Sequence, residues 1–152
     1  NIYFTTNYDY STKLWESDGT HINSTVIYQS NTSIRDLSSQ GGSLYFTTVD
    51  GTRIVLNKLD IHTGTVSNRG SINMSSDRSE IIYAEANNTV FYFIVNDSIY
   101  SHSDNGIHRL HSPTVASSGI AGVGGKVFFV ANYGYGMELM YHWYNPGPVI
   151  SI

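Results

Sequence analysis

The chain of 152 residues contains no cysteine. This absence excludes a disulfide framework and a metal site built from thiolates, although it does not exclude secretion. The sequence also lacks any stretch that approaches the roughly 18 consecutive apolar residues of a membrane-spanning helix. We therefore expect no membrane span, and the chain is long enough to form one hydrophobic core.

Charged residues are scarce, at 13% of the chain, which is about half of the usual share. The formal net charge is -4 and no block of basic residues occurs. Because nucleic-acid binding requires a basic surface, we expect no nucleic-acid partner. Ser, Thr, Asn, Gly and 12 Tyr supply the polar surface instead.

An apolar and aromatic segment recurs four times along the chain. Residues 2–6 (Ile-Tyr-Phe-Thr-Thr) return almost unchanged at residues 44–48, and looser copies occupy residues 90–93 and 127–130. The copies start at residues 2, 44, 90 and 127, so they lie 42, 46 and 37 residues apart. A strand-based repeat of about 40 residues is typical of β-propeller blades.

Each repeat contains short β-like runs separated by Gly- or Asn-containing turns, and no segment has the 3.6-residue periodicity of a helix. We predict an all-β propeller with four-stranded blades at about residues 1–33, 34–79, 80–116 and 117–152. The alternative architecture is a β-sandwich, which the repeat disfavours. The first unit lacks the strand that would precede residues 2–6, which makes about 15 strands in total.

A propeller with an incomplete ring has open strand edges, which natural β proteins normally pair or cover. We therefore expect further blades, either in the same chain or supplied by other copies of it. The predicted assembly edge is the opening strand, with the residues Ile2, Tyr3, Phe4, Thr5 and Thr6.

Residues 18–20 (Asp-Gly-Thr) lie between two strand-like runs. Asp-Gly predicts a tight type I′ hairpin, because both central residues of that turn have positive φ angles. We expect the Asp18 and Thr20 side chains to bond to the local backbone rather than to a ligand.

Three of the six histidines lie close together in the sequence, at His102, His108 and His111. Because odd spacings on a strand point to opposite faces, we interpret them as a surface set rather than as a metal site. We expect no metal and no cofactor.

Residues 14–20 (Leu-Trp-Glu-Ser-Asp-Gly-Thr) resemble the ELWxxDGT repeat of extracellular β-propellers. Lys13 stands where that family has an acidic residue, and residues 138–140 (Glu-Leu-Met) restore part of the motif. The tyrosine-rich strands followed by Asp-Gly-Thr are also similar to YWTD-type propellers of receptor ectodomains. Both resemblances imply a propeller outside the cell or on its surface. Neither family has a shared catalytic site, so no active residues are implied.

Five Asn-x-Ser/Thr sequons occur, at Asn23, Asn31, Asn73, Asn87 and Asn96. All of them fall in predicted loops or at strand ends, where an N-linked glycan is tolerated. The alternative is that a composition rich in Asn, Ser and Thr generates sequons by chance.

Two matching tyrosine segments lie in predicted loops: Tyr8 and Tyr10 in the first unit, and Tyr133 and Tyr135 in the fourth. Exposed tyrosines suit sugar rings or a protein partner, because the ring is apolar and the hydroxyl is polar. The alternative is that these rings pack over the ends of the strands.

The sequence therefore predicts a non-enzymatic extracellular glycoprotein with a structural or interaction role. We expect it to assemble with further blades or with copies of itself, and a filament is one form that such self-association takes. The alternative hypothesis is a carbohydrate-binding propeller that uses the loop tyrosines. A hydrolase remnant is a third and weaker alternative, because no motif places a nucleophile beside a base.

Overall fold

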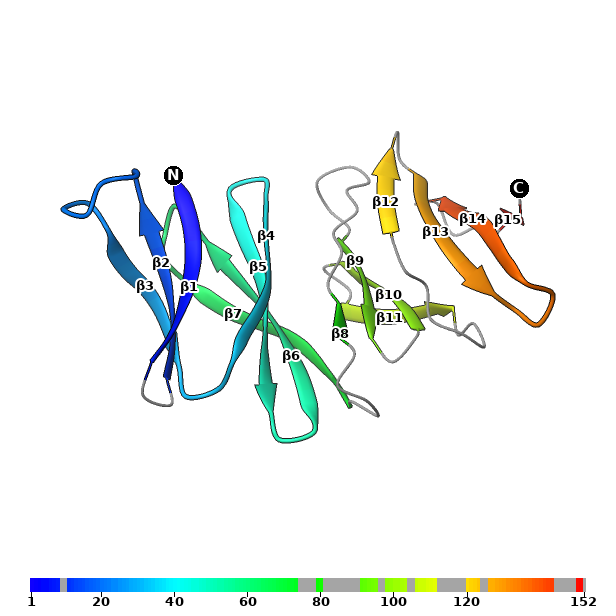
Figure 1. Ribbon diagram of the computed structural model, residues 1–152, viewed down its shortest axis with the longest axis horizontal. Helices are drawn as coiled ribbons and strands as arrows, with labels where there is room; N and C mark the ends of the chain where they lie inside the picture. The colour runs from blue at the N-terminus through cyan, green and yellow to red at the C-terminus, as the bar shows by residue number, and fades with distance from the viewer. Residues whose placement is uncertain are drawn as a thin grey trace. The chain divides into compact units, whose positions relative to one another are not determined.

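A computed structural model of the chain confirms the all-β prediction, because the residues that it describes form fifteen strands and no helix (Figure 1). The described residues are 1–8, 11–73, 79–80, 91–95, 98–103, 106–111, 120–123, 126–143 and 150–151. Tyr10 and the sequons at Asn87 and Asn96 lie outside the described residues. The chain divides into two compact units, Asn1–Asn73 and Met74–Ile152, which are described separately.

The first unit contains two antiparallel sheets. The first sheet has the order β1-β2-β3 and the second has the order β4-β5-β6-β7. Their strands are β1 (Ile2–Tyr8), β2 (Ser11–Ser17), β3 (Thr25–Ser30), β4 (Ile34–Gln40), β5 (Ser43–Asp50), β6 (Arg53–Asp60) and β7 (Val66–Asn73).

The second unit also contains two antiparallel sheets. The third sheet has the order β11-β10-β9-β8 and the fourth has the order β12-β13-β14-β15. Their strands are β8 (Ser79–Glu80), β9 (Phe91–Val95), β10 (Ser98–Ser103), β11 (Gly106–His111), β12 (Ile120–Val123), β13 (Lys126–Asn132), β14 (Met137–Trp143) and β15 (Ile150–Ser151). The blade boundaries given above stay predictions.

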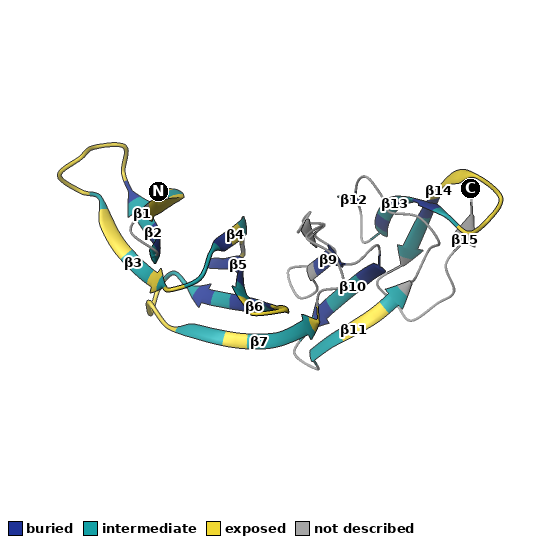
Figure 2. Ribbon diagram, turned by 60° about the horizontal axis from the view of Figure 1, so that its bottom comes forward, coloured by how far each residue is buried: buried dark blue, intermediate teal, exposed yellow. Residues whose placement is uncertain are grey.

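The core of the first unit lies between its two sheets. Leu14 of β2 packs in one cluster with Leu44 and Phe46 of β5, and Tyr3 and Tyr28 of the first sheet pack against this cluster. The rings of Phe46 and Tyr28 are 5.0 Å apart. The inner strands β5 and β6 are largely buried, whereas β3 and β7 are partly exposed (Figure 2). The two sheets therefore pack face to face, as the predicted blades of a propeller require.

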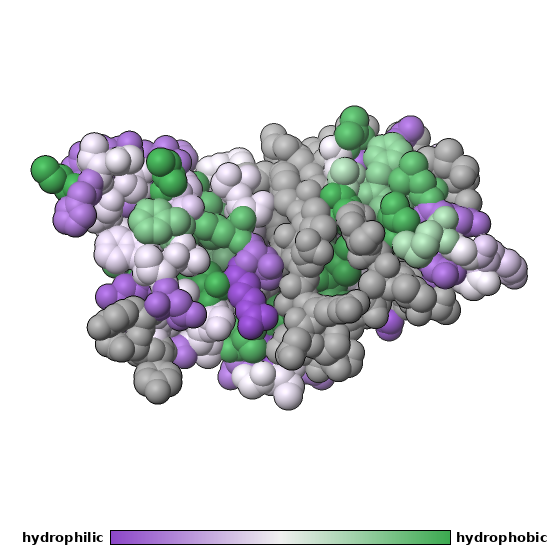
Figure 3. Space-filling model, in the orientation of Figure 1, coloured by the Kyte–Doolittle hydropathy of each residue, from purple (hydrophilic) through white to green (hydrophobic). Residues whose placement is uncertain are grey.

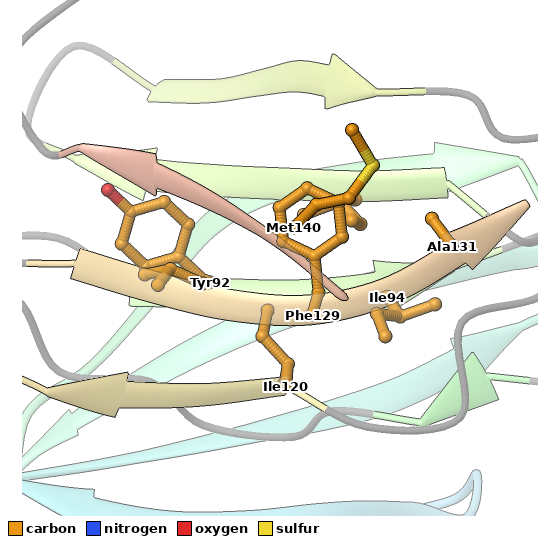
Figure 4. Close-up of a cluster of buried hydrophobic side chains, with 8 residues drawn as sticks. Tyr92, Ile94, Ile120, Phe129, Ala131 and Met140 are labelled. Carbon is orange, nitrogen blue, oxygen red and sulfur yellow. The ribbon is translucent and has the colours of Figure 1, made fainter. Parts of the chain in front are cut away.

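The second unit repeats this arrangement (Figure 4). Alternate residues of β13 are buried, so Phe129 and Ala131 enter the cluster while Phe128 points to the opposite face. From the third sheet, Tyr92 and Ile94 of β9 and Ile99 of β10 enter the same cluster.

Strand pairing corrects the predicted start of the third repeat by one residue. Thr5 pairs with Leu14 and Thr47 pairs with Leu56, and the equivalent pair in the third sheet is Ile94 with Ile99. The third copy therefore begins at Phe91 rather than at Val90. Val90 to Phe93 are all apolar, so the residue pattern alone does not indicate which of them point to the same face of the sheet.

A bulge recurs at one repeat position in three sheets. The register shifts between Leu14 and Trp15, between Leu56 and Asn57, and between Ile99 and Tyr100. Each shift leaves one extra residue in the outer strand of its sheet, and these residues are Ile27, Arg69 and Leu110. Bulges bend a strand and increase its twist, so these sheets share a local curvature that their sequences do not reveal.

The predicted tight turn at residues 18–20 is wrong. β2 ends at Ser17 and β3 begins at Thr25, so the connection is seven residues long. Gly19 has a φ of 98°, but Asp18 does not have the positive φ that a type I′ turn requires. The Asp18 side chain organises this longer loop instead.

Candidate functional site

The first sheet has one covered face and one exposed face. On its exposed face, Ile2 and Phe4 of β1 lie near Trp15 of β2 and Val26 of β3, and we call these four residues the first-sheet face. The Phe4 and Trp15 rings are parallel within 4°, with centroids 6.2 Å apart. The Trp15 indole nitrogen donates a hydrogen bond of 2.8 Å to the Thr6 hydroxyl. Figure 3 shows hydrophobic side chains on the visible side of this sheet.

The predicted assembly edge coincides with this face. β1 forms the edge of the first sheet, and no described strand pairs with its outer side. Ile2, Phe4, Thr5 and Thr6 are exposed, whereas Tyr3 is partly buried and its hydroxyl donates to Glu16 Oε1 at 3.0 Å. Burial, together with the neighbouring Glu16 carboxylate, raises the pKa of Tyr3. The edge is therefore apolar on its exposed face and anchored on its covered face.

The fourth sheet also has an exposed apolar face. Phe128 of β13 and Tyr141 of β14 form a ring pair with centroids 5.9 Å apart, beside the exposed side chains of Met137 and Leu139. We call these four residues the fourth-sheet face. The Lys126 ammonium lies 5.1 Å from the centre of the Tyr141 ring.

The tyrosine loop of the fourth sheet has a defined local structure. The Asn132 side-chain oxygen accepts hydrogen bonds from the backbone N–H groups of Gly134, at 2.7 Å, and of Gly136, at 3.2 Å. Tyr135 is 93% exposed and Tyr133 is 38% exposed. Partial burial raises the pKa of Tyr133. One ring of this pair is therefore fully available to a partner.

The tyrosine segment of the first unit is described only in part. Tyr8 is the last residue of β1, and neither its side chain nor Tyr10 is among the described groups. The two tyrosine segments belong to different units, and their use as one binding site stays a prediction.

A polar groove with a volume of about 340 Å³ lies beside the Tyr8 segment. We call it the β3–β4 groove. Thr12 donates a hydrogen bond of 3.0 Å to the Asn7 side-chain oxygen, which leaves the Asn7 amide NH2 group as a donor. Arg35 is the only charged residue among the described residues that line the groove, which are Asn7, Thr12, Asn31, Thr32, Ser33, Arg35 and Val49.

Sequence reasoning missed this groove, because it is built from short polar segments of five separate elements. The nearest signal was the tyrosine segment itself, which lies between Asn7 and Thr12.

The sequons that the structure describes are exposed. Asn23 lies in the β2–β3 loop, Asn31 directly follows β3, and Asn73 is the last residue of β7. Asn31 also lines the β3–β4 groove. These positions are accessible to a glycan, and glycosylation at them stays a prediction.

Asp18 holds the β2–β3 loop together, as its residue type predicted. Its Oδ1 accepts bonds from the Thr20 backbone N–H, at 2.9 Å, and from the Thr20 hydroxyl, at 2.7 Å. Its Oδ2 accepts a bond of 2.6 Å from the Asn23 amide. These donors lower the pKa of Asp18 to about 2, with the Thr20 and Asn23 side chains as the largest causes. The cluster is a turn-stabilising network.

The interpretation of the histidines as a surface set is wrong for His102. This residue is buried on β10, which lies between β11 and β9 in its sheet. Among the described residues, no group of three or more His, Cys, Asp or Glu side chains is placed to hold a metal ion. A search of the same residues for a long apolar helix that could cross a membrane also finds none.

No protein-family model matches the chain, and no curated protein matches it in sequence. Solved structures do match. They include TolB from Acinetobacter baumannii, with 19% identity, a TM-score of 0.62, and coverage of 98% of this chain and 39% of TolB. A chain of a nidogen–laminin complex matches with 10% identity, a TM-score of 0.62, and coverage of 98% and 60% respectively. An uncharacterized protein from Listeria monocytogenes matches with 11% identity, a TM-score of 0.64, and coverage of 99% and 49%.

These similarities show that the chain has the β-propeller fold. The chain spans between 39% and 60% of the length of these three structures. The propeller resemblance drawn from the sequence is therefore confirmed, while the closer resemblance to ELWxxDGT repeats stays a prediction.

Proposed function

We propose that this chain is part of a non-enzymatic, extracellular structural glycoprotein that acts through contacts between propeller blades. The observation that carries the proposal is the first-sheet face, where Phe4 and Trp15 are stacked beside the edge of β1 that no described strand pairs with. An exposed aromatic face next to an open strand edge is a feature that proteins cover with a partner.

Three further observations support the proposal. The chain spans only part of each propeller that it resembles, which leaves room in the ring for further blades. One of these structures is a complex of nidogen with laminin, so that propeller occurs in a protein assembly. The resemblance of residues 14–20 to the ELWxxDGT repeat points to an extracellular location. The proposal includes no catalytic activity, because the sequence contains no motif for it.

Hydroxyl-radical footprinting of the protein secreted from eukaryotic cells tests the assembly role. Phe4 and Trp15 should be protected from oxidation, whereas Ile22, which is 90% exposed in the β2–β3 loop, should react. Reaction at Phe4 as strong as that at Ile22 would contradict the proposal, because the face would then be uncovered in the native protein.

Intact mass before and after glycosidase treatment tests the glycoprotein role. We expect glycosidase treatment to lower the mass of the wild-type protein. This loss of mass should be smaller in each of the variants Asn23→Gln, Asn31→Gln and Asn73→Gln. Ser30→Ala is a matched control, because it changes a hydroxyl beside Asn31 without touching a sequon. An unchanged mass in the secreted wild-type protein would remove glycosylation from the proposal.

The β3–β4 groove supports a second candidate function, the binding of an acidic sugar. Its volume of about 340 Å³ lies at the lower end of the range for small-ligand pockets. Amide and hydroxyl groups around it match sugar hydroxyls, and Arg35 supplies one positive charge for one carboxylate. No carboxylate is among the described lining residues, so the charge of Arg35 favours an anionic ligand over a neutral one.

Calorimetric titration of unglycosylated protein with glucuronic acid and with glucose tests this candidate. The acidic sugar should bind about tenfold more tightly, and Arg35→Gln should remove the difference. Arg69→Gln, on β7, is the control with the same change of charge. Absence of binding by both sugars, or a preference that survives Arg35→Gln, would reject the candidate.

A further inference from the structure

Both observed contacts between sheets use the same repeat positions. We call the face of a sheet that packs on the next sheet its forward face, and the opposite face its backward face. In the first unit, the forward face of the first sheet presents Tyr3 and Leu14. The backward face of the second sheet presents Leu44 and Phe46.

The second unit repeats this contact at equivalent positions. The forward face of the third sheet presents Tyr92 and Ile99, and the backward face of the fourth sheet presents Val127 and Phe129. Phe46, Phe129, Leu14 and Ile99 all have an exposed fraction of 1% or less. The two contacts therefore have one design, in which a phenylalanine on a backward face meets an aromatic ring and an aliphatic side chain on a forward face.

The first-sheet face is a backward face that no described sheet of its unit covers. Ile2 and Phe4 occupy the repeat positions of Leu44 and Phe46, since residues 2–6 align with residues 44–48. Phe4 nevertheless has an exposed fraction of 37%, whereas Phe46 has one of 0%. The first sheet therefore presents the residues that the second sheet uses in its contact, but in an exposed position.

The fourth-sheet face is a forward face whose Met137 and Leu139 side chains are exposed. Phe128 occupies the position of Tyr3, and Leu139 occupies the position of Leu14, because Leu139 pairs with Val130 as Leu14 pairs with Thr5. Leu139 has an exposed fraction of 48%, whereas Leu14 has one of 0%. The described sheets therefore include one exposed backward face and one exposed forward face.

We propose that the fourth-sheet face of one copy of this chain packs on the first-sheet face of a second copy. This proposal rests on the assembly role proposed above and names the partner of the first-sheet face. The contact is heterologous, so it joins copies head to tail and generates a closed ring or a filament according to the rotation between them. Pairing of two identical faces is disfavoured, because it would join two backward faces or two forward faces and reproduce neither observed contact.

Two single variants and their mixture test the proposal. Phe4→Asp leaves only the fourth-sheet face intact, and Leu139→Asp leaves only the first-sheet face intact. A buried unpaired charge is costly, so each substitution should weaken self-association by about 100-fold. In sedimentation velocity, wild type should grow with concentration above its 16.9 kDa monomer, and each variant alone should stay monomeric. The mixture should stop at a dimer of one copy of each variant.

Both substituted residues are exposed, so the variants should retain the fold, and circular dichroism checks this. Ile22→Asp is the matched control, because Ile22 is an exposed apolar residue in a loop away from both faces. Its association should equal that of wild type.

Because the chain has no native cysteine, a second measurement is available. Mixing Phe4→Cys with Leu139→Cys under oxidising conditions should give a disulfide-linked pair that contains both variants. Either variant mixed with Ile22→Cys should give at least tenfold less of a disulfide-linked pair.

Three results would overturn the proposal: a wild type that stays monomeric at all concentrations, a Leu139→Asp variant that still dimerises, or a mixture that forms no heterodimer. If wild type is monomeric while footprinting still shows Phe4 protected in the secreted protein, the assembly role holds and this partner is wrong. If Phe4 is unprotected there as well, both proposals fail.

Discussion

Strands β1 and β5 contain nearly the same five residues, yet their environments are opposite. In β5, residues 43–48 are all buried, and the strand lies between β4 and β6. In β1, four of the five residues 2–6, which correspond to residues 44–48, are exposed, and β2 is the one described strand that pairs with it. The segment therefore encodes an inner blade strand, and its burial depends on the strands and sheets around it.

This comparison shows that the first repeat has kept the side chains of a covered strand. Phe4 and Ile2 have no role in a solvated edge, where charged residues and proline normally prevent unwanted pairing. The head-to-tail contact proposed above would cover both side chains. Mutations at matched positions of the two strands measure how far the equivalence extends.

The largest expected difference is between Phe46→Ala and Phe4→Ala. Removal of the fully buried Phe46 ring should lower the free energy of unfolding by about 3–5 kcal/mol, because it leaves a cavity in the core. Phe4→Ala should cost about 1 kcal/mol or less in the monomer. Denaturant unfolding at low protein concentration measures both. Equal losses would show that the Phe4 side chain is already covered within one chain.

The next difference compares Leu14→Ala in the first sheet with Leu139→Ala in the fourth. Leu14 lies in the core of its unit, so its truncation should cost about 2–5 kcal/mol. Leu139 is half exposed, so Leu139→Ala should lower the free energy of unfolding by about 1 kcal/mol or less. Raising the protein concentration should increase the cost of Leu139→Ala but leave that of Leu14→Ala unchanged. A cost of Leu139→Ala that is independent of concentration would contradict the head-to-tail contact.

A smaller effect is expected at the threonines that follow the two phenylalanines. The buried Thr47 hydroxyl donates a bond of 2.8 Å to the Asp36 carboxylate, and Asp36 has a positive φ of 56°. Thr47→Val removes this donor and should cost about 1–2 kcal/mol. Thr5→Val changes an exposed strand residue and should be neutral within about 0.5 kcal/mol. Thermal unfolding of both variants is sufficient, and a neutral Thr47→Val would show that the bond to Asp36 is dispensable.

The smallest effect concerns a feature that the two sheets share. Asp18 and Asp60 both begin hairpin loops, and backbone N–H groups of Thr63 and His62 lower the pKa of Asp60 as the Thr20 and Asn23 groups lower that of Asp18. A lowered pKa means that the charged form favours the folded state, so the contribution of Asp18 is present above about pH 4 and is lost as the pH falls toward 2.

Comparison of wild type with Asp18→Asn over this pH range checks the sign. The stability advantage of wild type should shrink between about pH 4 and pH 2. Asp60→Asn should behave in the same way, and the exposed Asp50→Asn serves as the control. An advantage that grows on acidification would contradict this account of the loop.

The repeat, the all-β structure of the described residues and the position of β1 at the edge of its sheet could be predicted from the sequence. Residues 2–6 and 44–48 are strongly β-forming, and glycine turns delimit them, so local signals agree with the fold. The phase of the third copy could not be predicted, because a run of four apolar residues has no alternation. The β2–β3 loop was misjudged because Asp18 favours side-chain hydrogen bonding as well as a tight turn.

The site was predicted less completely than the fold. The edge residues and the exposed Tyr135 follow from composition and position. Which of Tyr3 and Phe4 is the more buried depends on the face where the second sheet packs, and the sequence does not show this. The β3–β4 groove depends on which polar residues the strands bring together, and no local pattern reports that. Glycosylation at the five sequons depends on the cell that makes the protein, which is why it stays a prediction.

The recurring bulge has a consequence for how this chain tolerates change. Side chains of a strand alternate with a period of two, so one extra residue exchanges the two faces for everything that follows it. Deletion of Ile27 would remove that exchange from β3 and turn its remaining side chains to the wrong sheet face, although the deletion lies in an outer strand. Substitutions of exposed residues in the outer strands, such as Gln29, should be accepted readily, whereas deletion of one residue there should disrupt the packing of the strand.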